Sequence, residues 1–414
     1  MRHVSPGGTA PWALALLLAT GAAHAAIDGV SGPHFELIAR DGFILTPDGN
    51  SIHAWGYGVA GGDMQYPGPT LIVNQGDVVT LHLVNELPVP VSLVFPGQAG
   101  VVATGGVPGL LAREAAPGGD VSYTFQAREP GTYLYHSGTR PELQVEMGLV
   151  GALIVRPATP GQAYAHPATA FDHEYLFLLT EMDPRIHEQV EQGRMDEVDL
   201  TDYRPVYWFI NGRAAPDSMA PAGAPWLPNQ PYDCMPMMHP GERILLRMIG
   251  AGRDAHPLHT HGNHAAVIAR DARLLESAPG AGPDLAREHF TVTVAPGQTT
   301  DALFGWTGEK LGWDIYGHAA GDAPQPREYA PDHGKPFPVS LPNTQELLNG
   351  DFYSGSPFLG ALGPLPPGQG TLNLEGGFFF MWHSHSEREM VNNDVFPGGM
   401  MTMLLIVPHG VEIP

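Results

Sequence analysis

Paired histidines are the residues of this chain best suited to chemistry. His259 and His261 stand two positions apart, and so do His383 and His385. On a β-strand, residues two apart point to the same face, so each pair can present two imidazoles together. Two such strands side by side would bring three or four ring nitrogens to one point, enough to bind copper or zinc. The alternative is that these histidines are structural and bonded to their neighbours.

A second candidate for chemistry is the segment 234–239, which reads CMPMMH and combines soft sulfur ligands with an imidazole. Such a set could bind Cu(I) or accept an electron. Methionine is also a common filler of protein cores, and a lone cysteine such as Cys234 is usually buried and inert. We therefore prefer the packing interpretation for this segment, and we also expect His264 to be structural.

The composition narrows the class of protein. The 414 residues carry a net charge of −23, which argues against nucleic-acid binding because phosphate contacts need clustered Lys and Arg. Gly (52) and Pro (42) are abundant while charged residues make up only 15%, a balance typical of short strands joined by many turns. The single cysteine excludes an internal disulfide framework.

The N-terminus has the features of a secretory signal. Arg2 precedes an apolar run at 13–19, and Ala23-His24-Ala25 is a small-x-small cleavage site. We expect residues 1–25 to be removed and the mature chain to be periplasmic or secreted. No other segment of the sequence is apolar and long enough to span a membrane.

Strand-like apolar runs separated by turn residues recur along the chain, with no long amphipathic helix between them. They predict two β-sandwich domains, at 26–158 and 172–414, joined by a linker at 159–171. A Pro/Gly-rich insert at about 319–376 interrupts the second domain. The predicted strands are 35–39, 70–73, 78–84, 121–125, 132–135, 151–155, 175–179, 242–249, 265–268, 290–294, 302–304, 377–382 and 403–407.

Four motifs, in this order along the chain, resemble those of the multicopper oxidase family. They are YPGPTL at 66–71, GTYLYHS at 131–137, HPLHTHG at 256–262, and WHSH at 382–385 with GMM at 399–401. The resemblance implies two cupredoxin-like Greek-key β-sandwich domains and copper as cofactor. In the family, a type 1 copper held by a cysteine and two histidines receives electrons, and a trinuclear cluster held by four His-x-His pairs reduces dioxygen.

The motifs for the trinuclear cluster are incomplete in this sequence. The first His-x-His pair falls at 94–97, which reads VFPG, and the second is reduced to His136 because Gly138 stands in place of its partner. The third and fourth pairs are the four histidines described first.

The motifs for the type 1 site are poorer still. Ser384 replaces the cysteine, Glu389 stands where the second histidine falls, and only His256 remains. Because a hydroxyl is no substitute for a soft thiolate, we predict that there is no blue copper centre. The candidate metal ligands are His136, His256, His259, His261, His383 and His385. Carboxylates that could add oxygen ligands or orient the rings are Asp254, Glu387, Glu389 and Asp394.

These observations predict an exported, copper-binding protein of multicopper-oxidase type without a type 1 copper. If it is an enzyme, we expect a copper-dependent oxidoreductase acting on a small molecule or a metal ion. The alternative is a non-catalytic protein that sequesters or delivers copper, or a scaffold that has kept the fold. Assembly as a homotrimer is a further possibility, since a neighbouring chain could supply missing ligands.

Overall fold

The computed structural model describes residues 27–309, 314–318, 321–329, 339–340, 355–358, 372–373 and 377–413. The predicted signal sequence at 1–25 and most of the predicted insert at 319–376 lie outside these residues. Strands dominate the described part, and its longest helix, α2 (Pro184–Glu191), has eight residues. No helix found in these residues is long and apolar enough to cross a membrane.

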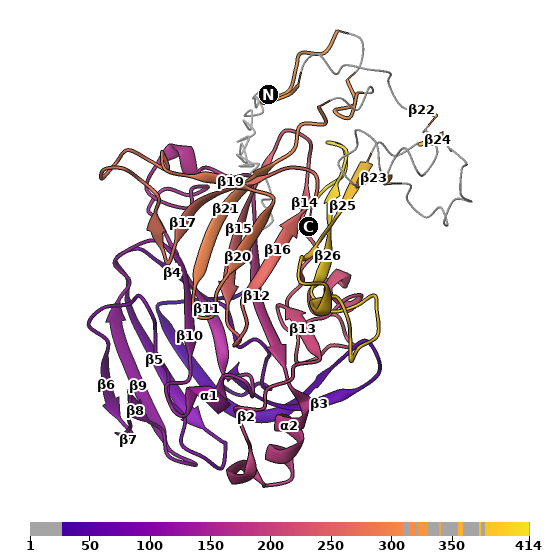
Figure 1. The fold of residues 1–414 in the computed structure, drawn as a ribbon. Coiled ribbons are helices and arrows are strands. Elements are labelled where there is room, and N and C mark those ends of the chain that lie inside the picture. The colour runs from indigo at the N-terminus through magenta and orange to yellow at the C-terminus, as the bar shows by residue number, and fades with distance from the viewer. Residues whose placement is uncertain are drawn as a thin grey trace, which may run out of the picture.

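Strands from the first part of the chain form a sandwich of two sheets, drawn in indigo and purple in Figure 1. One sheet has the order β1 (Val30–Ser31), β4 (Leu71–Asn74), β11 (Val150–Arg156), β10 (Gly131–His136). The other has the order β3 (Ser51–Val59), β2 (His34–Leu45), β5 (Val78–Asn85), β9 (Asp120–Gln126), β6 (Val102–Gly105). In β5, period-two alternation turns Val79, Leu81 and Leu83 into the core between the sheets.

A second sandwich follows from residue 173 onward, drawn in magenta to yellow (Figure 1). Its first sheet has the order β13 (Tyr207–Ile210), β12 (His173–Met182), β15 (Arg243–Gly250), β21 (Thr299–Gly305), β17 (Ala265–Arg270), β18 (Arg273–Leu274), with β19 (Arg287–His289) also paired to β17. Its second sheet has the order β14 (Met237–Met238), β26 (Met401–Ile406), β25 (Gly377–Ser384), β16 (His256–Thr260), β20 (Thr291–Val294), with β23 (Gly355–Phe358) paired to β25.

Strand β12 connects the two sandwiches. All ten of its residues are buried, because its two faces pack into different cores. Phe177 faces the core of the second sandwich, whereas Leu176 and Leu178 face a core shared with Leu134 of β10 and with β11 of the first sandwich. Polar contacts add to this apolar interface: the Thr132 hydroxyl donates to the Asp301 carboxylate at 2.6 Å. The two sandwiches are therefore packed together through a hydrophobic core.

The predicted all-β architecture is confirmed, and an observed strand overlaps each predicted strand. Several observed strands were not predicted, among them β3, β13 and β16, and β16 carries the HPLHTHG motif. The short elements are β7 (Val107–Pro108), β8 (Arg113–Glu114), α1 (Pro141–Gln144), β22 (Val339–Ser340), β24 (Leu372–Asn373), and the 3₁₀ turns at 167–169, 195–197, 217–219 and 387–389.

Candidate metal centre

The two His-x-His pairs lie side by side because their strands are neighbours. Strands β16 and β25 pair antiparallel, and the register places His259 directly opposite His383. His261 and His385 follow just after the ends of these strands. Directly opposite residues of an antiparallel pair have closely spaced side chains on one face of the sheet. Strand pairing alone therefore brings together imidazoles that are more than 100 residues apart in the sequence.

The four imidazoles form one compact cluster, here called the four-histidine group: His259, His261, His383 and His385. The Nε2 atoms of His261 and His383 are 3.1 Å apart. One ligand atom from each of His259, His261 and His383 lies within 4.8 Å of the others. The ring of His385 lies 4.8 Å from that of His259, centroid to centroid. This spacing can bring three or four nitrogens to a single ion.

The environment keeps these rings in the form that metals bind. Burial, and then the neighbouring imidazoles, lower the pKa of His259 to about 4. The pKa of His383 is lowered as well, chiefly by burial. Neutral imidazole is the ligand form of histidine, so both rings are ready to coordinate at neutral pH.

Hydrogen bonds orient two of the rings. Nδ1 of His383 lies 2.7 Å from the Ser384 carbonyl oxygen, which can only accept, so Nδ1 carries the proton and Nε2 is the nitrogen that could coordinate a metal. Nδ1 of His259 lies 2.9 Å from the Thr291 hydroxyl. Bonds of this kind commonly support metal-bound histidine. An all-imidazole donor set of this geometry fits copper or zinc.

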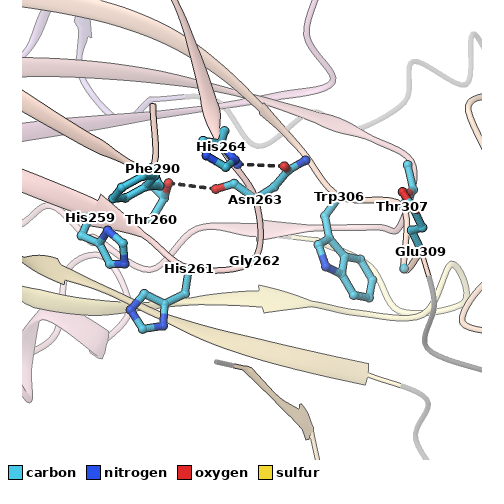
Figure 2. Close-up of a pocket in the computed structure, with 11 residues that line it drawn as sticks. His259, Thr260, His261, Gly262, Asn263, His264, Phe290, Trp306, Thr307 and Glu309 are labelled. Carbon is cyan, nitrogen blue, oxygen red and sulfur yellow. Dashed lines mark hydrogen bonds between the residues drawn. The ribbon is translucent and has the colours of Figure 1, made fainter. Parts of the chain in front are cut away.

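A cavity of about 500 Å³ opens beside the group. Figure 2 shows His259 and His261 on one side of it, with Trp306, Thr307 and Glu309 on the other. Phe290 packs edge-on against the His259 ring. The candidate centre thus borders a space large enough for a small molecule, with aromatic side chains in its wall.

His136 lies apart from this group. It ends β10 in the first sandwich, and its Nδ1 is 2.9 Å from the Ser137 carbonyl oxygen. Burial lowers its pKa. Among the ring contacts of the described residues, none joins His136 to the four-histidine group. As in His383, Nδ1 of His136 faces a backbone carbonyl and burial lowers the pKa, but His136 belongs to the first sandwich.

His256 has an entirely different environment. Its Nε2 is 2.9 Å from Glu181 and its Nδ1 is 3.0 Å from Glu389, and its side chain is fully buried. Burial lowers the pKa of this ring, but the hydrogen bonds and charges of the two carboxylates outweigh burial and raise it to about 9. His256 is therefore a buried imidazolium with both ring nitrogens donating.

The replacements at the predicted type 1 position take part in the same network. The Ser384 hydroxyl donates to the Glu389 carboxylate at 2.6 Å. Glu181, on β12, was not predicted from the sequence. The one signal was a carboxylate just beyond the apolar run at 175–179, which must be paired if the strand is buried. Of the other proposed acidic ligands, Asp254, Glu387 and Asp394 are exposed.

The sulfur-rich segment packs largely inward. Cys234 is buried, its thiol donates to the Ile210 carbonyl at 3.0 Å, and burial raises its pKa well above the usual value. Met238 lies in the core of the second sandwich. His264 is exposed on the rim of the cavity (Figure 2). These environments fit the packing interpretation of Cys234.

Solved structures of copper proteins share the fold of this chain. The fold is similar to that of a blue copper oxidase from Nitrosomonas europaea (TM-score 0.58, 21% identity, covering 90% of this chain and 85% of that one). It is also similar to a copper nitrite reductase from the same organism (TM-score 0.52, 16% identity, covering 92% and 95%). The chain thus has the cupredoxin-type double sandwich that the sequence motifs imply.

Sequence similarity to multicopper oxidases covers part of the chain. Residues 50–160 match the multicopper oxidase family model. A multicopper oxidase of Talaromyces pinophilus is 41% identical over 95 residues, covering 22% of this chain and 15% of that protein. A copper resistance protein A homolog of Pseudomonas syringae pv. tomato is 27% identical over 318 residues, covering 69% and 51%. The predicted relationship to the multicopper oxidases is confirmed, and copper is the metal of that family. The chain spans about half or less of the length of these curated relatives.

Proposed function

We propose that this protein binds copper through its four-histidine group. The observation that carries the proposal is the convergence of His259, His261, His383 and His385 across the β16–β25 pair. The low pKa values of His259 and His383 support it, because no proton has to be displaced from these rings at neutral pH.

We further propose that the protein is an oxidoreductase acting on a small molecule or a metal ion in the adjoining cavity. Copper at the four-histidine group would supply one-electron redox chemistry. Trp306 and Phe290 would limit water beside the rings, and the Ser384 carbonyl would hold His383 in one orientation. Glu309, at the edge of the cavity, adds a negative charge that favours a cationic substrate.

Type 1 copper has no place in this proposal. His256 has both ring nitrogens engaged by Glu181 and Glu389, and Ser384 offers a hydroxyl that is already hydrogen-bonded. At this position the positive charge of the His256 imidazolium, balanced by two carboxylates, would stand where the family has a metal ion.

The loss of the type 1 ligands beside a retained four-histidine group favours a second candidate function, the sequestration or delivery of copper without turnover. A protein that has lost the usual electron-accepting site can keep an affinity for copper. Tight copper binding, with no oxidation of phenols, Cu(I) or Mn(II), would support this alternative. Oxidation that depends on His383 and His385 would support the oxidoreductase.

The deciding experiment is copper content and EPR of the mature protein after copper loading, for wild type and His383→Ala/His385→Ala. The matched control is His264→Ala, which removes an exposed imidazole from the same cavity. We expect bound copper without an intense blue band in wild type and control, and loss of that copper in the double variant. Equal copper in all three proteins would refute the assignment.

We also propose that the protein is exported after removal of residues 1–25. N-terminal sequencing of the exported protein should show a mature chain that begins near Ala26.

A homotrimer could bring His136 of one chain to the four-histidine group of the next, since both lie near the surfaces of their sandwiches. Sedimentation as a monomer at working concentration would remove this option.

A further inference from the structure

A second cluster of imidazole and carboxylate groups lies outside the four-histidine group. It consists of His173 at the start of β12, His239 after β14, and Glu242 in the turn before β15. One ligand atom from each lies within 4.8 Å of the others. Because β12 and β15 are neighbouring parallel strands, with His173 opposite Ile244, the sheet itself places His173 beside the turn.

The three side chains converge on a single oxygen atom. Nε2 of His173 lies 2.8 Å from Oε2 of Glu242, and Nδ1 of His239 lies 3.1 Å from the same oxygen. The backbone N–H of His239 donates to this oxygen as well, at 2.7 Å, which fixes the carboxylate in the turn. The carboxylate is thus held with both rings facing it.

The hydrogen bonding of His239 identifies its coordinating nitrogen. Nε2 lies 2.8 Å from the Val411 carbonyl oxygen, which can only accept, so Nε2 carries a proton. Nδ1 is therefore the nitrogen turned toward Glu242. In metal-bound histidine one ring N–H commonly donates to a backbone carbonyl, as Nε2 of His239 does, and the other nitrogen is left to the metal.

The rest of the surroundings makes the cluster a fixed yet accessible site. His173 is buried, whereas the side chains of His239 and Glu242 are 15% and 22% exposed. The ring of His409 stacks on that of His239, with centroids 5.0 Å apart and planes 12° apart. The cluster is thus packed against His409 on one side and partly exposed, so water can complete a coordination shell.

We propose that His173, His239 and Glu242 form a second metal site, separate from the four-histidine group, that binds a divalent transition-metal ion such as Zn²⁺. Two imidazole nitrogens and one carboxylate oxygen, with an open position, are a donor set that suits Zn²⁺ and also accepts Cu²⁺. Because Val411 and His409 belong to the C-terminal segment that follows β26, the ion would also fasten that segment to the turn before β15 (Figure 1).

The test uses His383→Ala/His385→Ala as the starting protein, so that the four-histidine group does not contribute. We expect this protein to bind one equivalent of Zn²⁺ by isothermal titration calorimetry, and its Tm to rise on adding Zn²⁺ because the ion binds the folded state. His239→Ala should abolish binding, and Glu242→Gln should weaken it on the order of tenfold or more. Circular dichroism confirms that each variant is folded.

The control is His82→Ala. His82 also lies between two carboxylates, Glu36 at 2.6 Å and Asp120 at 3.2 Å, but in the first sandwich and on different ring nitrogens. This control should keep the Zn²⁺ equivalent. If the starting protein binds no Zn²⁺, or if His239→Ala and Glu242→Gln bind it as tightly as His82→Ala, the cluster is only an ion-paired one.

The result is independent of the proposed copper function. If the four-histidine group does not bind metal but this second site does, wild type and the starting protein will bind the same single equivalent. If the four-histidine group binds metal but the second site does not, wild type will bind metal and the starting protein will bind none. His239→Ala in the wild-type background provides the same comparison without the double substitution.

Discussion

Two histidines three positions apart on strand β16 have opposite chemical states. His256 points into the buried interior between Glu181 and Glu389, and its pKa is raised to about 9. His259 lies on the other face of the strand among three further imidazoles, and its pKa is lowered to about 4. At neutral pH the first is a cation held by acids, and the second is a neutral ligand.

The comparison shows that partners, and not burial alone, decide what a histidine can do. Burial lowers the pKa of both rings. Only where carboxylates face the ring is this effect reversed. The seven-residue motif at 256–262 therefore contains one structural cation, His256, and two candidate metal ligands, His259 and His261.

The largest effect should come from breaking the buried ion pair with Glu181→Gln. This change leaves the His256 imidazolium with one carboxylate in a fully buried environment. We expect the free energy of unfolding to fall by about 3–5 kcal/mol, the usual cost of removing one partner of a buried pair. Chemical denaturation measures it. Glu387→Gln, at an exposed carboxylate, should change it by no more than about 0.5 kcal/mol.

The second prediction concerns alkaline pH. The pKa of His256 is about 9 in the folded state and about 6.5 when unfolded. Its contribution to stability is therefore complete below pH 6.5 and is lost as pH rises through 9, in total about 3 kcal/mol. Denaturation series across this window should show the decline in wild type. A decline of equal size in His256→Gln would contradict the assignment.

The third prediction concerns the copper-binding face. Thr291→Val removes the hydroxyl that holds Nδ1 of His259 and keeps the shape of the side chain. We expect about a tenfold loss of copper affinity, because such supporting bonds orient the ligand ring. Competition with a chelator measures the affinity. Thr293→Val, on the same strand with an exposed side chain, is the control and should bind copper as wild type does.

The fourth prediction concerns acid pH in the metal-free protein. The pKa of His259 is depressed in the folded state, so its neutral form favours folding above pH 6.5. This contribution is lost as pH falls through about 4, the opposite direction to that of His256. His259→Gln should flatten part of the acid-side decline relative to wild type. No change in that decline would show that the ring is not held neutral by the fold.

Much of the fold could be predicted from period-two patterns, because alternation in strands such as β5 reflects burial on one face of a sheet. The pairing of β16 with β25 could not be predicted in this way, since the strands are separated by the long insert. The resemblance to a known family implied only that the two His-x-His pairs belong to one metal cluster. Glu181 was found by neither route, because it lies on a strand distant in sequence from His256 and no motif surrounds it.

The second cluster shows the same limit. His239 and Glu242 are close in sequence, but His173 reaches them only through the pairing of β12 with β15. Nothing in the spacing of these residues indicates a site.

The sequence by itself determined the sandwich class, the relationship to the multicopper oxidases, and the identity of the paired histidines, because these depend on local periodicity and on residue types in order. Only the tertiary structure decided which histidines share a site, which of them is charged, and which carboxylates face them. Those properties depend on contacts between strands far apart in the chain, and on the burial and charge that these contacts create around each ring.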